Sequence, residues 1–86
     1  MRIDLFLNKL CLTKTRNIAK TACDKNLVRI NGKIAKASHE VKAGDIVSFD
    51  LYGFRHTIEV LEIPSGNVAK KDTTRFYTLS EKILLD

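Results

Sequence analysis

Residues 13–32 read TKTRNIAKTACDKNLVRING, and this stretch decides the fold. Its first half predicts a helix, because apolar side chains recur at the spacing of one helical face. That face comprises Ile18, Ala19, Ala22 and Cys23. The second half predicts a tight stop, a short strand and a hairpin turn. The other helix positions are mostly basic or polar, so the helix should bury one side and present a cationic side to a partner.

The two ends of this helix carry separate signals. Either Thr13 or Thr15 is expected to cap its N-terminus, since a hydroxyl there accepts a hydrogen bond from an unpaired backbone N–H. Lys14 and Arg16 are then expected in the first turn. Cations at this end oppose the helix dipole, so a bound anion such as a phosphate explains them better than stability does. Asn26 is expected to end the helix in the left-handed conformation.

The flanking segments predict a small domain of class α+β. Residues 3–11 have apolar side chains at helical spacing and form the expected first helix. Cys11 and Cys23 then fall on apolar helix faces, where free thiols behave as small buried hydrophobes. The expected architecture is two N-terminal helices packed on a small, mostly antiparallel β-sheet, with a short C-terminal β extension. We expect a principal domain at residues 1–63, with residues 64–86 packed on or beside it.

Alternating apolar residues and turn signals predict the strands. The expected elements are a hairpin of residues 28–30 and 33–36 around Asn31-Gly32, strands at 46–51 and 55–63 with a bulge near residues 60–61, a loop at 64–74, a strand at 76–79, and a helical turn or frayed end at 80–86. The bulge is expected because the apolar residues change phase within the strand at 55–63.

Charge is unevenly distributed along the 86 residues. Residues 1–36 carry nine basic and two acidic side chains, a net charge of +7, whereas residues 37–86 carry six basic and eight acidic side chains, a net charge of −2. Such segregation indicates a polyanionic partner, either nucleic acid or an anionic membrane. A membrane-surface helix needs large apolar residues opposite its bases, and the small Ile-Ala-Ala-Cys face does not supply them. We therefore expect an RNA partner and no membrane partner.

The sequence offers no catalytic or cofactor motif. His39 and His56 have no evident nucleophile partner, and neither a Gly-rich phosphate loop nor a useful carboxylate pair occurs, so we predict no enzyme and no small-molecule substrate. A zinc site of these histidines with the two cysteines would lack the close-paired spacing of structural zinc, so we expect no metal and no cofactor. Secretory and membrane-spanning patterns are also lacking, which predicts a cytoplasmic protein.

Four short motifs follow one another in a specific order. They are Met1-Arg2-Ile3-Asp4, Lys14-Thr15-Arg16, Val28-Arg29-Ile30-Asn31-Gly32 and Val41-Lys42-Ala43-Gly44-Asp45. In order and spacing they resemble the S-four RNA-binding domain over about residues 1–50. With its short β tail, the chain is similar to free-standing bacterial members of that family: the ribosome-associated quality-control protein P family and the heat-shock protein of fifteen kilodaltons.

The resemblance implies binding to the large ribosomal subunit carrying a stalled peptidyl-tRNA, with contacts to rRNA and tRNA, in ribosome quality control or recycling. Such RNA is bound through phosphates, 2′-hydroxyls and shape more than through base sequence. A general RNA- or tRNA-binding module without a ribosome-rescue role, and a basic protein-interaction module, are the alternatives. Nothing indicates a dimer, so we expect a monomer.

The resemblance and the basic pattern together give the candidate RNA-binding residues. They are Arg2, Lys14, Thr15, Arg16, Lys20, Arg29, Asn31, Lys33 and Lys36. Arg29, Lys33 and Lys36 are expected to project from the hairpin beside the basic helix. Tyr52 and Tyr77 are expected away from the basic residues, so no aromatic platform for base stacking is predicted.

Overall fold

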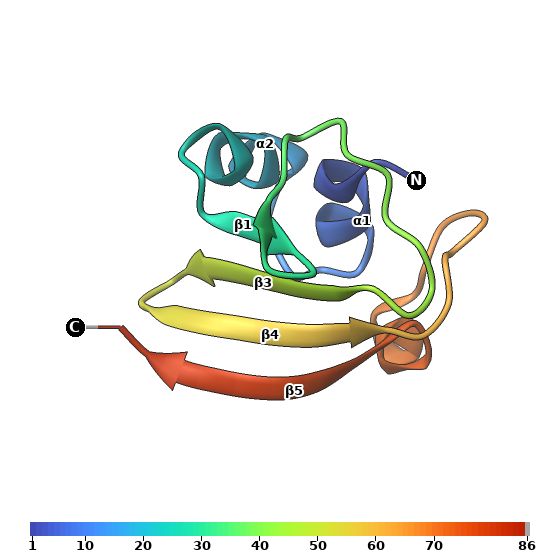
Figure 1. Ribbon diagram of the computed structural model, residues 1–86. Helices are drawn as coiled ribbons and strands as arrows, with labels where there is room; N and C mark the ends of the chain where they lie inside the picture. The colour runs from blue at the N-terminus through green and yellow to red at the C-terminus, as the bar shows by residue number, and fades with distance from the viewer. Residues whose placement is uncertain (86) are drawn as a thin grey trace.

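The computed structural model describes residues 1–85. The elements are α1 (Ile3–Lys9), α2 (Arg16–Asp24), β1 (Val28–Ile30), β2 (Lys33–Ile34), β3 (Ile46–Leu51), β4 (Phe54–Val60), the 3₁₀ helix η1 (Lys70–Arg75) and β5 (Tyr77–Leu84). The strands form one antiparallel sheet in the order β2-β1-β3-β4-β5. Figure 1 shows both α-helices on one face of this sheet, with η1 at the end where β4 stops and β5 begins. The predicted α+β class is confirmed.

Local signals set the ends of α2 as the sequence predicts. The Thr15 hydroxyl accepts a hydrogen bond from the Ile18 N–H at 3.1 Å, and Asn26 turns the chain after the helix with φ 61°. The buried Thr13 hydroxyl instead donates to the Thr15 carbonyl at 2.9 Å. Thr15 is therefore the cap. Lys14 precedes the helix, and the expectation that it lies in the first turn is wrong.

Two tight turns set the register of the sheet. One is formed by Asn31 and Gly32, with φ values of 53° and 83°, and the other by Tyr52 and Gly53, with φ values of 56° and 80°. A two-residue hairpin loop of type I′ has such a pair of left-handed residues, and its twist matches that of the strands. The predicted hairpin at Asn31-Gly32 is confirmed, but its second strand, β2, ends at Ile34 rather than at residue 36.

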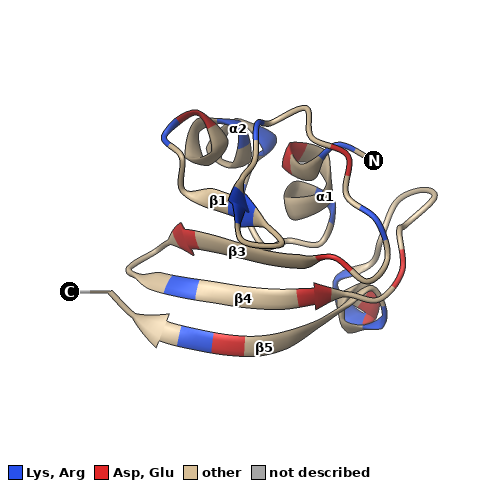
Figure 2. Cartoon of the chain, in the orientation of Figure 1, with Lys and Arg blue, Asp and Glu red and all other residues tan. Residues whose placement is uncertain are grey.

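The charge asymmetry of the sequence becomes an asymmetry within the fold. Residues 1–36, with a net charge of +7, form α1, α2 and the β1–β2 edge of the sheet. In Figure 2, most of the charged residues in α2 and β1 are basic (blue). Strands β3, β4 and β5 together carry both basic (blue) and acidic (red) residues. The cationic part of the molecule is therefore the helical layer and the adjoining sheet edge.

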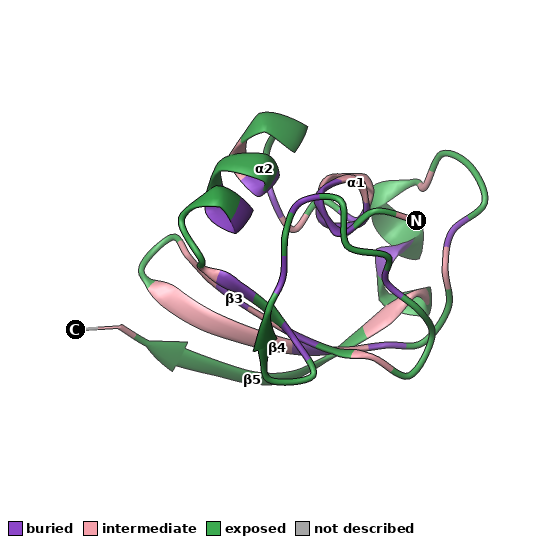
Figure 3. Ribbon diagram, turned by 45° about the horizontal axis from the view of Figure 1, so that its top comes forward, coloured by how far each residue is buried: buried purple, intermediate pink, exposed green. Residues whose placement is uncertain are grey.

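The core lies between the helices and the face of the sheet that they cover. The apolar side chains with at most 1% exposure are Ile3, Phe6, Leu7, Leu10, Ala19, Val28, Ala35, Val47, Phe49, Ile58 and Val60. Each large one contributes about 1.5–3 kcal/mol by leaving water. The inward side of α2 carries only small residues at Ala19, Ala22 and Cys23, visible as the purple side of that helix in Figure 3. Their small size lets α2 lie close to α1.

The C-terminal strands differ from the sequence-based expectation. β4 ends at Val60 rather than at residue 63. The irregularity also lies elsewhere than predicted: Thr57 pairs with Glu81 while Ile58 pairs with Leu79, so β5 carries one extra residue at this point. The apolar alternation changes after Val60 because β4 ends there and the chain leaves the sheet. It does not indicate a bulge at that position.

β5 is the longest strand, whereas the sequence predicts a strand at residues 76–79 followed by a helical turn or frayed end. It runs for eight residues, through Leu84, and forms the sheet edge beside β4. From Thr78 to Leu84 every residue is exposed, so no buried face imposes an apolar alternation on this sequence. The expected loop at 64–74 likewise contains most of η1. Asp86, the last residue of the expected end, lies outside the described residues.

Candidate nucleic-acid interface

A buried carboxylate, that of Asp4, lies beneath two exposed arginines of the N-terminal region. Asp4 is in the first turn of α1, is 1% exposed, and accepts a hydrogen bond from the Leu5 N–H at 2.8 Å. The Nε of Arg2 lies 3.3 Å from its Oδ1, and the Nε of Arg16 lies 3.4 Å from its Oδ2. One acid therefore fixes two arginines that come from separate segments of the chain.

Both arginines remain open to a partner. The side chain of Arg2 is 44% exposed and that of Arg16 is 48% exposed. Arg16 donates to Asp4 through Nε. Its two terminal guanidinium nitrogens make no hydrogen bond to the described residues 1–85, so they can donate to a partner. Such a planar pair of N–H groups matches two oxygens of a phosphate. The group of two arginines and one acid keeps a net charge of +1, so an anion is still attracted.

Backbone pairing holds Arg2 in this position. Arg2 forms a bridge with Glu40, and the Ile3 N–H donates to the His39 carbonyl at 2.8 Å. The ammonium of Met1 donates to Glu40 at 2.6 Å. This hydrogen bond and the charge of the ammonium lower the pKa of the Glu40 carboxyl, so it stays ionised at neutral pH. The segment around residue 40 is therefore a support for the arginine pair.

Two shallow hollows join four of the candidate residues. The first, of about 280 Å³, is lined by Arg2, Asp4, Arg16, Asn17 and Lys20. The second, of about 360 Å³, is lined by Arg2 together with Lys36 and the C-terminal end of α2. Because Arg2 lines both, the surface is continuous. We call Arg2, Arg16, Lys20 and Lys36 the basic patch.

Arg29 does not belong to the basic patch. Its neighbours Val28 and Ile30 are 0% and 4% exposed and point into the core below the helices. Successive side chains of a strand point to opposite faces, so the exposed Arg29 lies on the face that the helices leave uncovered. The expectation that it projects beside α2 is wrong.

The hairpin turn forms a separate surface. Asn31, Lys33 and Lys42 line a hollow of about 450 Å³ that shares no residue with the two hollows of the basic patch. Asn31 has a structural task there: its amide donates to Asp45 Oδ1 at 3.1 Å, and its side-chain carbonyl accepts from the Ile46 N–H at 2.9 Å. Of the candidates in this turn, Lys33 is the one that offers a charge.

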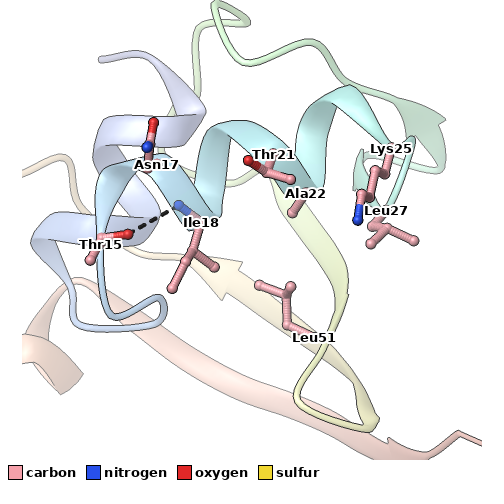
Figure 4. Close-up of a pocket in the computed structure, with 8 residues that line it drawn as sticks. All are labelled: Thr15, Asn17, Ile18, Thr21, Ala22, Lys25, Leu27 and Leu51. Carbon is pink, nitrogen blue, oxygen red and sulfur yellow. Dashed lines mark hydrogen bonds between the residues drawn. The ribbon is translucent and has the colours of Figure 1, made fainter.

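Lys14 lies beside Tyr52, an aromatic residue that is expected to lie away from the basic residues. Its backbone N–H donates to the hydroxyl of Tyr52 at 3.2 Å, which ties the start of α2 to the β3–β4 turn. The expectation that Tyr52 lies away from the basic residues is therefore wrong. Thr15, also a candidate, uses its hydroxyl for the helix cap (Figure 4). Lys14 and Tyr52 are 38 positions apart in the sequence, so no local sequence pattern predicts their contact.

The two cysteines have different environments. Cys23 is buried at the edge of the basic patch, and burial, followed by the charges of Asp4 and Asp24, raises its pKa to about 11. Cys11 is exposed, because α1 ends at Lys9 and the chain turns away with φ 59°. The expectation of a buried thiol is confirmed for Cys23 and wrong for Cys11.

The described part of the chain has neither a metal-binding cluster nor a membrane-spanning helix. Within residues 1–85 no three His, Cys, Asp or Glu side chains are grouped so that they could hold a metal ion. No helix there has the length and hydrophobicity needed to cross a membrane.

Comparison with known proteins identifies the family. The family model described as the S4 domain matches residues 1–47, which include α1, α2, the β1–β2 hairpin and the whole basic patch. The chain belongs to the S4 domain family. This is the S-four family that the motif order indicates.

Similar S4 domain proteins carry a common name. The chain is 45% identical over 74 residues to the RQC P-site tRNA stabilizing factor of Helicobacter pylori, a match that covers 85% of this chain and 88% of that protein. It is 35% identical over 79 residues to the factor of the same name from Bacillus subtilis, covering 92% and 91% of the two chains. Both matches are longer than the 47 residues that the S4 domain model covers, so they extend beyond it.

Two solved structures share the fold. The Vibrio cholerae Heat Shock Protein 15, described as trimeric, superposes with a TM-score of 0.86 at 24% identity, covering 93% of this chain and 81% of that one. The solution structure of a hypothetical protein gives a TM-score of 0.81 at 40% identity, covering 94% and 98%. The overall arrangement of helices and sheet is thus shared with both solved structures.

Proposed function

We propose that this protein binds structured RNA through the basic patch and stabilises the P-site tRNA during bacterial ribosome-associated quality control. The binding site would lie on the large ribosomal subunit that carries a stalled peptidyl-tRNA. The observation that carries the proposal is the pair of exposed arginines fixed by the buried Asp4, within the residues that the S4 domain model matches. Relatives that share nearly the full length of the chain bear the corresponding name.

The basic patch supports binding to phosphates rather than to base edges. Arg2 and Arg16 are held rigidly enough to meet two oxygens of one phosphate, whereas Lys20 and Lys36 act as flexible point charges around them. Lys14 and Lys33 lie beyond the patch and are proposed to contact neighbouring phosphates. Thr15 and Asn31 are proposed to act through the backbone they hold, and Arg29 is left out because it lies on the other face.

The proposed role is one of binding, without catalysis or a cofactor. A factor that holds tRNA on a ribosome acts by contact and position alone, which suits a surface of arginine and lysine. It also implies a protein of the bacterial cytoplasm. We propose that it binds as a monomer, since the basic patch is formed within one chain.

Two matched arginine variants test the proposal. Arg16→Ala should weaken binding to purified large subunits carrying peptidyl-tRNA by about 1.5–3 kcal/mol, as loss of a charge-assisted contact does. Arg29→Ala removes the same charge from the uncovered face of the sheet and should leave the affinity nearly unchanged. Sedimentation with the subunits measures both. Equal losses in the two variants would show that net charge alone drives binding, and no loss in Arg16→Ala would remove Arg16 from the site.

The bound RNA separates the proposed function from a general RNA-binding role. Crosslinking in cells followed by RNA sequencing should recover tRNA together with rRNA from one region of the large subunit. Recovery of many unrelated RNAs in proportion to their abundance would favour a general RNA-binding module instead.

A further inference from the structure

A groove between α2 and β3 lies on the other side of α2 from the arginine pair. It has a volume of about 420 Å³ and an apolar floor formed by Ile18, Ala22, Leu27 and Leu51. Figure 4 shows the side chains of Ile18 and Leu51 pointing toward one another from the helix and the strand. Ile18, Leu27 and Leu51 are all partly exposed, so the packing of the core leaves this floor open.

The rim of the groove has hydrogen-bonding groups and one cation. Thr15, Asn17, Thr21 and Lys25 line it, and no carboxylate is among its lining residues. Asn17 also lines the first hollow of the basic patch, so the groove and the patch meet along α2. An anionic chain bound at Arg16 would therefore pass the mouth of the groove without meeting a negative charge.

Tyr52 stands beside the groove. It follows Leu51 in the chain, and its hydroxyl accepts the hydrogen bond from Lys14, next to Thr15 on the rim. Its ring is therefore fixed at both ends, and the residue is still 51% exposed. It has φ 56°, a conformation for which a two-residue turn ordinarily takes Asn, Asp or Gly. A bulky aromatic residue there costs stability, and an external stacking partner would account for it.

We propose that Tyr52 and the apolar groove hold one unpaired nucleobase of the bound RNA. The inference rests on the proposed function and adds that the RNA partner presents a base outside its helical stack. A base offers an apolar face to Tyr52 and the aliphatic floor, and polar edges to Asn17 and Thr21. Lys14 and Lys25 supply charges for the flanking phosphates.

The charge of the surroundings favours RNA over a protein side chain as the occupant. An apolar groove alone would also accept a leucine or phenylalanine from another protein. Here it adjoins the basic patch through Asn17, Lys25 is the one charged residue among those that line it, and the Tyr52 hydroxyl accepts its hydrogen bond from the backbone of Lys14. A polyanion with protruding flat groups matches both features at once.

Binding to three RNA hairpins of one sequence tests the inference. The first has a single bulged 2-aminopurine, the second an abasic site at the same place, and the third is fully paired. The chain contains no tryptophan, so the fluorescence of 2-aminopurine is read without interference. The wild-type protein should bind the base-bulged hairpin about 5- to 150-fold more tightly than the abasic one, the range expected for stacking of one base on an aromatic residue.

Variants at Tyr52 and on the rim assign the effect. Tyr52→Asn suits the turn but removes the ring, and should bring the ratio of the two affinities to about one. Tyr52→Phe keeps the ring and should keep most of the ratio. Thr21→Glu puts a carboxylate on the exposed rim and should also abolish the preference, whereas Thr74→Glu, an equal charge change in η1, should not.

The outcomes separate this inference from the proposed function. A ratio near one in the wild type, or an unchanged ratio in both Tyr52→Asn and Thr21→Glu, overturns the base-binding site while binding that depends on Arg16 still stands. RNA binding that is insensitive to Arg16→Ala on all three hairpins removes Arg16 from the RNA site and counts against the basic patch on which the proposed function rests. The base-binding site is supported if the wild type prefers the base-bulged hairpin and both Tyr52→Asn and Thr21→Glu lose that preference.

Discussion

At the scale of single residues, Asp4 explains how an acid comes to lie in the most basic part of the chain. A buried carboxylate is unfavourable unless charges and hydrogen bonds compensate for its lost hydration. Asp4 receives two guanidinium groups and the Leu5 N–H, which provide that compensation. The same contacts restrain Arg2 and Arg16, so the acid lowers the net charge of the surface but fixes the geometry in which it meets a phosphate.

Asp4→Asn separates these two effects. The substitution keeps the size of the side chain and raises the net charge by one, but it removes both ion pairs. We expect RNA affinity to fall by about 1–2 kcal/mol, because the charge-assisted contacts that hold the arginines are lost. Asp24→Asn, the same charge change at the exposed end of α2, should leave the affinity equal or slightly higher. Tighter binding by Asp4→Asn would mean that charge matters and orientation does not.

The cysteines give a prediction of chemical reactivity. Cys11 is exposed, whereas Cys23 is buried with a pKa of about 11, so at pH 8 its thiol is almost wholly protonated and shielded from reagents. One equivalent of a thiol reagent such as DTNB should react rapidly with the native protein, and a second only on unfolding. Cys11→Ser should remove the fast phase. Fast loss of both thiols would indicate that α2 opens readily from α1.

Among the helices and strands, the features that can be predicted are those that a few neighbouring residues determine. The cap at Thr15, the stop at Asn26 and the turn at Asn31-Gly32 are each encoded within a few residues, and the structure has all three. The face of Arg29 is also encoded locally, because its apolar neighbours Val28 and Ile30 both point inward. β5 could not be recognised, because a strand without a buried face has no apolar alternation; its pairing with β4 defines it.

Asn31 is a test of how the hairpin is held. Asn31→Ala loses two side-chain hydrogen bonds and places a Cβ-bearing residue without compensation at φ 53°, so we expect a loss of about 2–4 kcal/mol in the free energy of unfolding. Asn31→Gly tolerates the positive φ and should lose only about 1–2 kcal/mol. Urea denaturation measures both. Equal losses in the two variants would show that the backbone conformation contributes little.

At the scale of the whole molecule, the segregation of charge was readable from the sequence but its shape was not. The net +7 of residues 1–36 predicted a cationic surface, yet this charge divides among the basic patch, the hairpin hollow and the uncovered face of the sheet. The division follows from strand alternation and from the contact of Asp4 with Arg16, twelve positions apart. Composition therefore overstates the number of charges that one RNA segment can meet.

The salt dependence of RNA binding measures that number. If the four cations of the basic patch, together with Lys14 and Lys33 beyond it, each neutralise one phosphate, the logarithm of the association constant should fall with the logarithm of salt concentration with a slope of roughly −4.2 to −5.4. Arg16→Ala should make the slope shallower by about 0.7–0.9, and Arg29→Ala should leave it unchanged. A slope near −7 would mean that all the basic residues of the N-terminal half engage RNA, which would require the RNA to wrap around both faces of the sheet.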